Sequence, residues 1–179
     1  MDKLGNNDVV ISTTGKISRE LFEYRKNKKQ NHKTDFYVVG SMGCSSGLSL
    51  GVALNSRKNV FLIDGDGSIL MKMGTLATIG KYKPKRFTHI IIDNSVYGST
   101  GGQPSSSSIV DWEKLFLSFG YKESIVIIDK KQLINLSLRN DSSPSAIIIK
   151  VNQEYREDLG RPTLTPIQIK ENFMKFLKN

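Results

Sequence analysis

The stretch NVFLIDGDGS, residues 59–68, places a continuous apolar run directly before a Gly–Asp–Gly turn. A short apolar run rich in β-branched residues is typical of a strand that is buried on both faces of a sheet. The glycines on either side of Asp66 carry no side chain, so the backbone there can approach another group closely. Gly–Asp–Gly is also a common turn without function. The residues that follow the other strands are needed to choose between these interpretations.

Five more apolar runs of strand length occur along the chain, at 8–12, 35–40, 88–93, 124–129 and 145–151. Helical patterns lie between and after the strands, at 18–27, 44–54, 111–120, 129–140 and 165–178. The expected N-caps of the last three helices are Asp111, Asp129 and Thr165. Thr165 also forms a capping box with Gln168, and Pro166 stands in the first turn of the same helix. In the helix at 129–140, Leu133 and Leu136 lie on one side. Alternating strands and helices predict a three-layer α/β/α sandwich around a six-stranded parallel sheet, of the doubly wound, Rossmann-like class.

The composition excludes several classes of protein. A chain of 179 residues with 38% hydrophobic and 24% charged residues is long enough for one domain with a core. No apolar run approaches the length of a membrane span, and no signal peptide is evident. The lone Cys44 cannot form an internal disulfide, which favours a reducing, cytoplasmic setting. The net charge of +9 is not accompanied by a nucleic-acid motif, so we expect it to favour small anions instead.

Gly, Ser, Thr, Asp and Asn are concentrated after the first four strands, in STTGK (12–16), GSMGCSSG (40–47), DGDGS (64–68) and DNSVYGSTGGQP (93–104). Ligands of doubly wound folds bind beyond the carboxyl ends of the strands. Glycine backbone N–H groups can converge there on an anion, and the oxygens of Asp66 and Asn94 suit Mg²⁺ or Ca²⁺. One cysteine and two separated histidines give no zinc ligand set. The glycine spacing fits neither the dinucleotide fingerprint nor a Walker A loop. The pattern therefore predicts a metal-bridged diphosphate site.

The pairing of GDGS with DNSVYG, in which 26 residues separate Gly67 from Asn94, resembles the thiamine diphosphate signature. Asp93 stands where that signature has the first of two asparagines, which adds a negative charge nearby. Segments between residues 9 and 175 resemble the C-terminal domain of phosphonopyruvate decarboxylases, and sulfopyruvate decarboxylases are the next most similar. The resemblance implies a single thiamine diphosphate-binding domain over residues 1–179. Cys44 departs from this pattern, because a histidine is usual there.

The resemblance also implies roles for individual residues. Asp66, Asn94 and the carbonyl of Val96 would hold Mg²⁺ between the two phosphates. The carbonyl of Gly40 would accept a hydrogen bond from the aminopyrimidine, and Met42 would be the apolar wedge that keeps the cofactor bent. The remaining cofactor-binding residues would line the diphosphate, chiefly through backbone N–H groups: Thr14, Gly15, Ser41, Gly65, Gly67, Ser68, Tyr97 and Gly98. Candidates for contact with an anionic substrate are Lys16, Arg19, Cys44 and Arg161.

By this resemblance the complete enzyme would decarboxylate a small anionic 2-oxo acid, converting phosphonopyruvate to phosphonoacetaldehyde and CO₂. Sulfopyruvate decarboxylase (its beta subunit), an acetolactate synthase-like carboligase and a non-catalytic cofactor-binding or assembly module are the alternatives. The activating Glu of the family belongs to a pyrimidine-binding domain that this sequence does not contain. We therefore expect a partner domain or subunit, an inactive isolated chain, and a homo-oligomer, either a dimer or a larger assembly. No nucleic-acid or membrane partner is expected.

Overall fold

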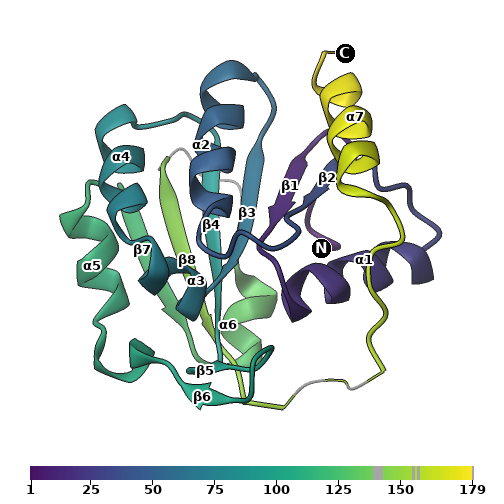
Figure 1. Cartoon of the computed structure of the whole chain (residues 1–179). Coiled ribbons are helices and arrows are strands. Elements are labelled where there is room, and N and C mark those ends of the chain that lie inside the picture. Colours follow the sequence, from purple (N-terminus) through teal and green to yellow (C-terminus); the bar gives the residue numbers. More distant parts are fainter. Residues whose placement is uncertain (139–142, 155, 157, 179) are drawn as a thin grey trace.

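The computed structural model describes residues 1–138, 143–154, 156 and 158–178 (Figure 1). Its centre is a six-stranded sheet in which every pairing is parallel, with the order β2-β1-β3-β4-β8-β7. The strands are β1 (Val9–Ser12), β2 (Asp35–Tyr37), β3 (Val60–Gly65), β4 (Phe87–Asp93), β7 (Glu123–Ile127) and β8 (Ser145–Lys150). All six predicted strands are confirmed, as is the parallel sheet.

Side chains of neighbouring strand positions point to opposite faces, and both faces of the central strands are buried. Val9 and Ile11 belong to a large core beneath α2 (Ser45–Asn55), α4 (Gly74–Tyr82), α5 (Trp112–Ser118) and α7 (Pro166–Leu177). Val10 points the other way, into a smaller core with Leu21 and Phe22 of α1 (Lys16–Asn27). The continuous apolar pattern of the strands follows from this double burial, and the predicted three-layer arrangement is confirmed.

The predicted helix caps are confirmed where helices begin. Asp111 accepts a hydrogen bond from the backbone of Lys114, and Asp129 accepts one from that of Gln132. Thr165 and Gln168 form a complete capping box at the start of α7. These side chains satisfy backbone N–H groups that have no partner within the helix, so each fixes the residue at which its helix starts.

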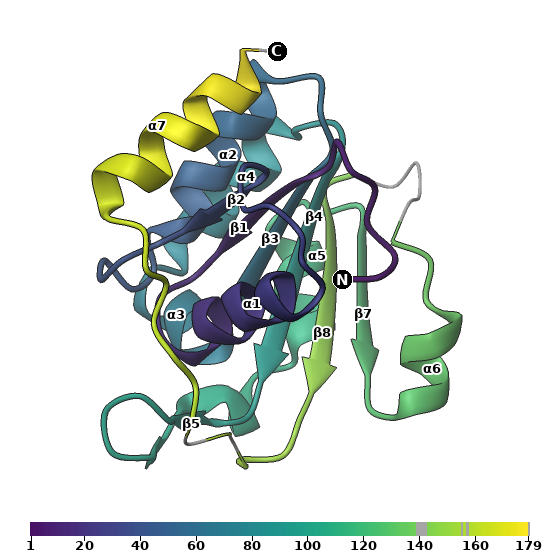
Figure 2. The ribbon, with the colours of Figure 1, turned by 90° about the vertical axis from the view of Figure 1, so that its right-hand side faces the viewer.

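The helix predicted at 129–140 is shorter than expected, and residues 139 and 140 lie outside the described residues. α6 spans Lys130–Asn135 and contains no buried residue, while Leu136 already has extended backbone geometry. Figure 2 shows α6 beside β7, the edge strand at the end of the sheet farthest from α7. An edge strand offers little apolar surface to cover, so Leu133 stays exposed and does not form a packed stripe with Leu136.

The crossover between β3 and β4 contains two helices that the sequence pattern did not reveal, α3 (Asp66–Met71) and α4. The segment after β4 forms a short antiparallel hairpin of β5 (Val96–Tyr97) and β6 (Gln103–Pro104), followed by the 3₁₀ turn η1 (Ser106–Ile109). None of the helices in the described parts of the chain is long and apolar enough to cross a membrane.

Candidate functional site

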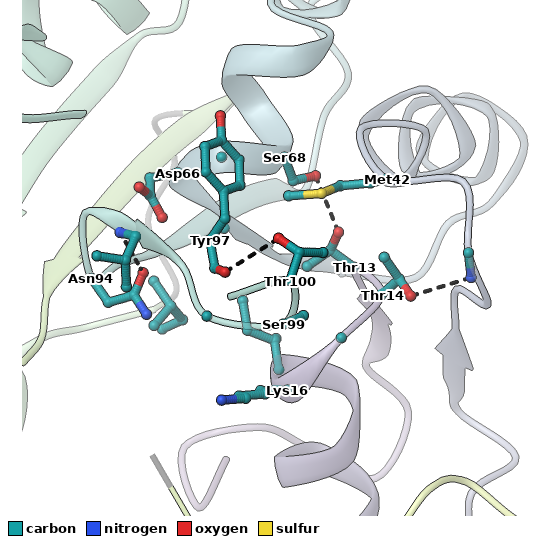
Figure 3. Close-up of a pocket in the computed structure, with 18 of the residues that line it drawn as sticks. Thr13, Thr14, Lys16, Met42, Asp66, Ser68, Asn94, Tyr97, Ser99 and Thr100 are labelled. Carbon is teal, nitrogen blue, oxygen red and sulfur yellow. Dashed lines mark hydrogen bonds between the residues drawn. The ribbon is translucent and has the colours of Figure 1, made fainter. Parts of the chain in front are cut away.

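A pocket of about 390 Å³ lies at the carboxyl ends of β1, β3 and β4 (Figure 3). The strand order reverses here, because the chain passes from β1 to β2 on one side and then to β3 on the other. Loops that follow β1 and β3 therefore diverge and leave a crevice between them, as in other doubly wound sheets. Every residue that the sequence indicated for cofactor binding lines this pocket: Thr14, Gly15, Gly40, Ser41, Met42, Gly65, Asp66, Gly67, Ser68, Asn94, Val96, Tyr97 and Gly98.

The pocket has two chemically different ends. Asp66 and Asn94 lie at one end in Figure 3, and Met42 lies on the other side of the pocket. The first end offers carboxylate and amide oxygens, which suit a hard cation. The second offers an apolar side chain that can press against a ring. An extended ligand with an anionic, metal-binding end and an apolar end would match both.

Asp66 is the first residue of α3 and is only 3% exposed. The hydroxyl of Ser105 donates a hydrogen bond to its Oδ2. Burial raises the pKa of Asp66 above its ordinary value; the hydrogen bond from Ser105 opposes this shift, and the charge of Asp93 adds to it. A cation beside Asp66 would offset the cost of keeping this carboxylate ionised in a buried position.

Asn94 and Val96 follow β4 in a tight turn. The Oδ1 atom of Asn94 accepts a hydrogen bond from the backbone N of Val96 at 3.2 Å, and Ser95 between them has a left-handed φ of 59°. This turn fixes the amide of Asn94 relative to the backbone of Val96. Among the described residues, no group of three or more His, Cys, Asp or Glu side chains is arranged so that it could hold a metal ion. A metal ion at this end would therefore depend on neutral amide and carbonyl oxygens beside Asp66.

Asp93, which replaces an asparagine of the signature, is buried and ion-paired rather than left as an added charge. Its Oδ2 accepts hydrogen bonds from Lys150 Nζ, from Ser107 Oγ at 2.5 Å and from Trp112 Nε1 at 3.0 Å. Burial alone would raise the pKa of Asp93, but the hydrogen bonds from Lys150 and Ser107 outweigh it and lower the pKa below its ordinary value. The positive charge of Lys150 thus compensates the substitution.

Ser68 joins three of the segments that form the pocket. Its hydroxyl lies 3.1 Å from that of Thr13, which follows β1, and it accepts a hydrogen bond from the backbone N of Gly43 at 3.1 Å. The backbone N of Gly40 donates to Thr14 Oγ1 at 3.2 Å. These bonds tie the loop that carries Met42 to the ends of β1 and β3. Ser68 itself is 1% exposed, so its side chain braces the pocket wall.

Asp64, the residue before the Gly–Asp–Gly turn, supports the same loop. Asp64 is fully buried, and its Oδ2 accepts hydrogen bonds from Ser45 at 3.0 Å and Ser46 at 3.1 Å, in the first turn of α2. The same oxygen lies 3.6 Å from Nε2 of the buried His89. Asp64 thereby fixes the start of α2, and with it the preceding segment that contains Met42, to the end of β3.

Two glycines are required by close contacts inside the pocket. A Cβ atom on Gly67 would lie 2.3 Å from the ring of Tyr97, well inside contact distance. Gly15 has a left-handed φ of 94°, and a Cβ atom there would lie 2.8 Å from Ser99 Oγ. Backbone N–H groups at such positions stay accessible to an anion because no side chain covers them. The loop chemistry therefore fits a diphosphate group.

The four residues suggested for substrate contact are not brought together. Lys16 lines the pocket, whereas Arg19 of α1 is not among its lining residues. Cys44 is exposed and lines a separate hollow of about 290 Å³ with Val39 and Leu48 of the same region. Arg161 is exposed in the segment before α7. Lys16 is thus the one of these four side chains that the structure brings into the pocket.

Several residues that line the pocket or support it were not singled out from the sequence. Ser99 and Thr100 complete the wall beyond Gly98, and the Thr100 hydroxyl lies 3.4 Å from the Tyr97 carbonyl oxygen (Figure 3). In the sequence, only their place in the polar stretch after β4 indicated that Ser99 and Thr100 could line the pocket. Ser105 contacts Asp66 from the PSSSS segment, which carries no recognisable motif. Its contact arises from tertiary folding and has no local signature.

Comparisons with known proteins agree with this geometry. The family described as thiamine pyrophosphate enzyme, C-terminal TPP binding domain, matches residues 13–138. A phosphonopyruvate decarboxylase of Streptomyces viridochromogenes is 36% identical over 98% of this chain, which spans 43% of that relative's length. A sulfopyruvate decarboxylase subunit beta of Methanococcus maripaludis is 38% identical over 96% of this chain and 90% of that relative.

A solved structure, described as a thiamin diphosphate-dependent enzyme isolated from Mycobacterium smegmatis, shares the fold. It superposes with a TM-score of 0.53 and 14% sequence identity, over 83% of this chain and 29% of that one. At this identity the likeness concerns the fold alone. The family match covers all of the residues that line the pocket, from Thr13 to Thr100. The chain therefore belongs to the thiamine pyrophosphate enzyme family and forms its C-terminal thiamine pyrophosphate-binding domain.

Proposed function

We propose that this chain is the cofactor-binding half of a thiamine diphosphate- and Mg²⁺-dependent 2-oxo acid decarboxylase. The observation that carries the proposal is the two-ended pocket, with Asp66 and Asn94 at one end and Met42 at the other. Thiamine diphosphate has the corresponding two ends, a diphosphate that binds through a metal ion and an aromatic pyrimidine. The family match supports the same cofactor.

In this proposal Asp66, Asn94 and the Val96 carbonyl would hold Mg²⁺, whose positive charge would offset that of the diphosphate. The Gly40 carbonyl would accept a hydrogen bond from the aminopyrimidine, and the apolar side chain of Met42 would press against the cofactor and orient it. Bound thiamine diphosphate supplies the nucleophilic carbon and the electron sink that loss of CO₂ from a 2-oxo acid requires. The chain would orient the cofactor and provide an apolar wall beside it. The diphosphate is lined by Thr14, Gly15, Ser41, Gly65, Gly67, Ser68, Tyr97 and Gly98.

The substrate that we propose is phosphonopyruvate, which would yield phosphonoacetaldehyde and CO₂ in a pathway of phosphonate biosynthesis. Lys16, in the pocket wall, would offer a positive charge to one of the anionic groups of the substrate. Sulfopyruvate is the second candidate, supported by the similarity to two sulfopyruvate decarboxylase beta subunits, 38% and 34% identical to this chain. The two acids differ in the anionic group on the third carbon and share the 2-oxo acid that reacts.

The complete enzyme would need a second part. We propose that a pyrimidine-binding domain or subunit supplies the activating Glu and that the assembly is a dimer or a larger homo-oligomer. The naming of two relatives as subunit beta supports a partner chain. The free thiol of Cys44 supports a reducing, cytoplasmic location.

Calorimetric titration of thiamine diphosphate into the chain, with Mg²⁺ or with EDTA, tests the cofactor site. We expect binding in Mg²⁺ and its loss in EDTA, and at least a tenfold weaker affinity in Asp66→Ala, by about 1.4 kcal/mol or more. Asp158→Ala, which removes an exposed carboxylate outside the pocket, is the matched control and should bind as the wild type does. Metal-independent binding, or equal binding by Asp66→Ala, would contradict the proposed site.

The substrate is tested by CO₂ release from phosphonopyruvate and from sulfopyruvate. The chain combined with the pyrimidine-binding half should release CO₂ preferentially from phosphonopyruvate, and the isolated chain should release none. Preference for sulfopyruvate would select the second candidate. Cofactor binding without turnover of either acid by the combined halves would instead indicate a cofactor-binding module without catalysis.

A further inference from the structure

Asp93 sits at the end of β4, next to the proposed metal ligand Asn94, and its carboxylate accepts five hydrogen bonds. Oδ1 accepts from the backbone N of Ser95 at 3.0 Å and from its hydroxyl at 3.2 Å. Oδ2 accepts from Ser107 Oγ, Trp112 Nε1 and Lys150 Nζ. The carboxylate is thus saturated by donors from four segments and is only 1% exposed. It faces the protein interior and serves as an anchor for the turn that begins at Asn94.

The serines after β6 connect this anchor to Asp66. The Ser105 hydroxyl donates to Asp66 Oδ2, and the Ser105 backbone N donates to the Ser95 carbonyl at 2.8 Å. The backbone N of Ser107 donates to Ser105 Oγ at 3.3 Å, and the Ser107 hydroxyl donates to Asp93. We call Asp93, Ser105, Ser107 and Lys150 the serine clamp. It links Asp66 and the turn of Asn94 and Val96, two segments far apart in the sequence, to one support.

Lys150 supplies the positive charge of the clamp. Asp93 and Lys150 are partners in the parallel register of β4 and β8, so the sheet itself brings them side by side. The Asp93 side chain is 0% exposed and that of Lys150 is 36% exposed, so the lysine reaches from the surface to a buried anion. Removing Lys150 would leave the buried Asp93 carboxylate without a cation, which costs more than removing both charges together.

We propose that Lys150 is a positioning residue for the Mg²⁺–diphosphate site: by completing the serine clamp it holds the turn of Asn94 and Val96 in register with Asp66. The inference rests on the proposed function, because it concerns how that same metal site is held. It also accounts for the Asp–Asn sequence at the end of β4, since the buried Asp93 needs a cation and β8 provides one.

Trp112 is a built-in reporter of the clamp. It is the only tryptophan of the chain, and its Nε1 lies 3.0 Å from both Asp93 Oδ2 and Ser107 Oγ. Its emission can follow titration of thiamine diphosphate into the full chain in Mg²⁺. Lys150→Met should shift the emission of the free protein and raise the apparent Kd about tenfold, the lower end of the effect of removing a partner of a metal ligand, because Lys150 acts through Asp93 beside the ligand Asn94.

The compensating variant separates positioning from general damage. Asp93→Asn combined with Lys150→Met removes both charges and should restore the Kd to within about threefold of the wild type, because no buried charge is left unpaired. Lys150→Arg, which keeps the charge, should also behave as the wild type does. Lys131→Met, on the exposed face of α6, is the matched control and should leave Kd and emission unchanged. Should Lys150→Met not fold, Lys150→Gln replaces it and should raise the Kd by a smaller factor.

Unchanged Kd and emission in Lys150→Met, or a double variant that binds no better than Lys150→Met alone, would overturn the clamp while leaving the cofactor site intact. A wild-type chain whose thiamine diphosphate binding is independent of Mg²⁺, or absent, would overturn both the proposed function and the clamp. Calorimetry on the wild type therefore tells the two failures apart.

Discussion

Gly80 in α4 is packed directly against the backbone at the end of α5, and Gly80→Ala should be strongly destabilising. A Cβ atom on Gly80 would lie 1.6 Å from the carbonyl oxygen of Phe119 and 2.7 Å from its carbonyl carbon. An ordinary contact needs about 3.5 Å, so the two helices would have to separate by about 2 Å. The Cα atom of Gly120 would also lie 3.2 Å from the added Cβ, so the obstruction on this side consists of backbone atoms.

The expected cost follows from these distances. Overpacking of a core costs about 1–3 kcal/mol and occasionally more, and here the obstructing atoms are backbone rather than a movable side chain. The gain of about 0.5–1 kcal/mol from replacing glycine in a helix offsets only part of this. We expect Gly80→Ala to lower the free energy of unfolding by about 3 kcal/mol and the Tm by about 6–12 °C for a chain of this size.

Gly51→Ala is the matched control, because it makes the same chemical change inside a helix with nothing within 4 Å of the added Cβ. It should raise the free energy of unfolding by about 0.5–1 kcal/mol. Urea unfolding and thermal scans of both variants measure the two effects on one scale. If Gly80→Ala unfolds within about 0.5 kcal/mol of the wild type, the inferred contact between α4 and α5 is wrong.

Changes at three other residues test single features of the structure. Gly67→Ala should weaken Mg²⁺-dependent thiamine diphosphate binding at least tenfold, or about 1.4 kcal/mol, because a side chain would then cover the backbone N–H at this position. The Tm should change little, since the half-exposed ring of Tyr97 can move away from the added Cβ. Wild-type affinity in calorimetry would contradict this. Asp64→Asn should cost about 2 kcal/mol in urea unfolding, since it removes the buried charge beside His89 and disturbs two serine hydrogen bonds. Burial lowers the pKa of His32, so the unfolded chain binds the proton more readily and stability should fall as the pH drops below about 6.5; His32→Gln should flatten that slope, and an unchanged slope would assign it to other groups.

The strands and the pocket residues could be predicted because their signals are local. Val9, Val10 and Ile11 are buried on alternate faces of the sheet, and double burial leaves a continuous apolar run in the sequence. Parallel strands also bring their carboxyl ends to one edge, so the polar residues after β1, β3 and β4 had to meet. Given the fold class, the positions of Asp66 and Asn94 at one pocket follow from their places in the sequence.

The helices between β3 and β4 were missed for an equally physical reason. Gly67, Gly74 and Gly80 interrupt this segment, and glycine weakens the helical signal because it lacks intrinsic helix propensity. Gly67 and Gly80 instead allow close contacts with distant parts of the chain, with Tyr97 and with Phe119. The helix predicted at 129–140 was too long for the opposite reason. Its apolar residues suggested a buried side, but beside an edge strand they have little surface to cover.

The serine clamp shows which part of a site a single sequence does not reveal. Asp66 and Asn94 are recognisable because the proposed metal site would restrict the residue types and the strand ends restrict their positions. Ser105 and Lys150 contact Asp66 and Asp93 from 39 and 57 residues away in the chain, and in our proposal these contacts hold the metal site in place. Serine and lysine are common surface residues, so their presence in the sequence does not indicate such a role. The burial of Asp93, however, demands a cation nearby, so a strand-end carboxylate in place of an amide is itself a reason to search the neighbouring strand for a lysine or arginine.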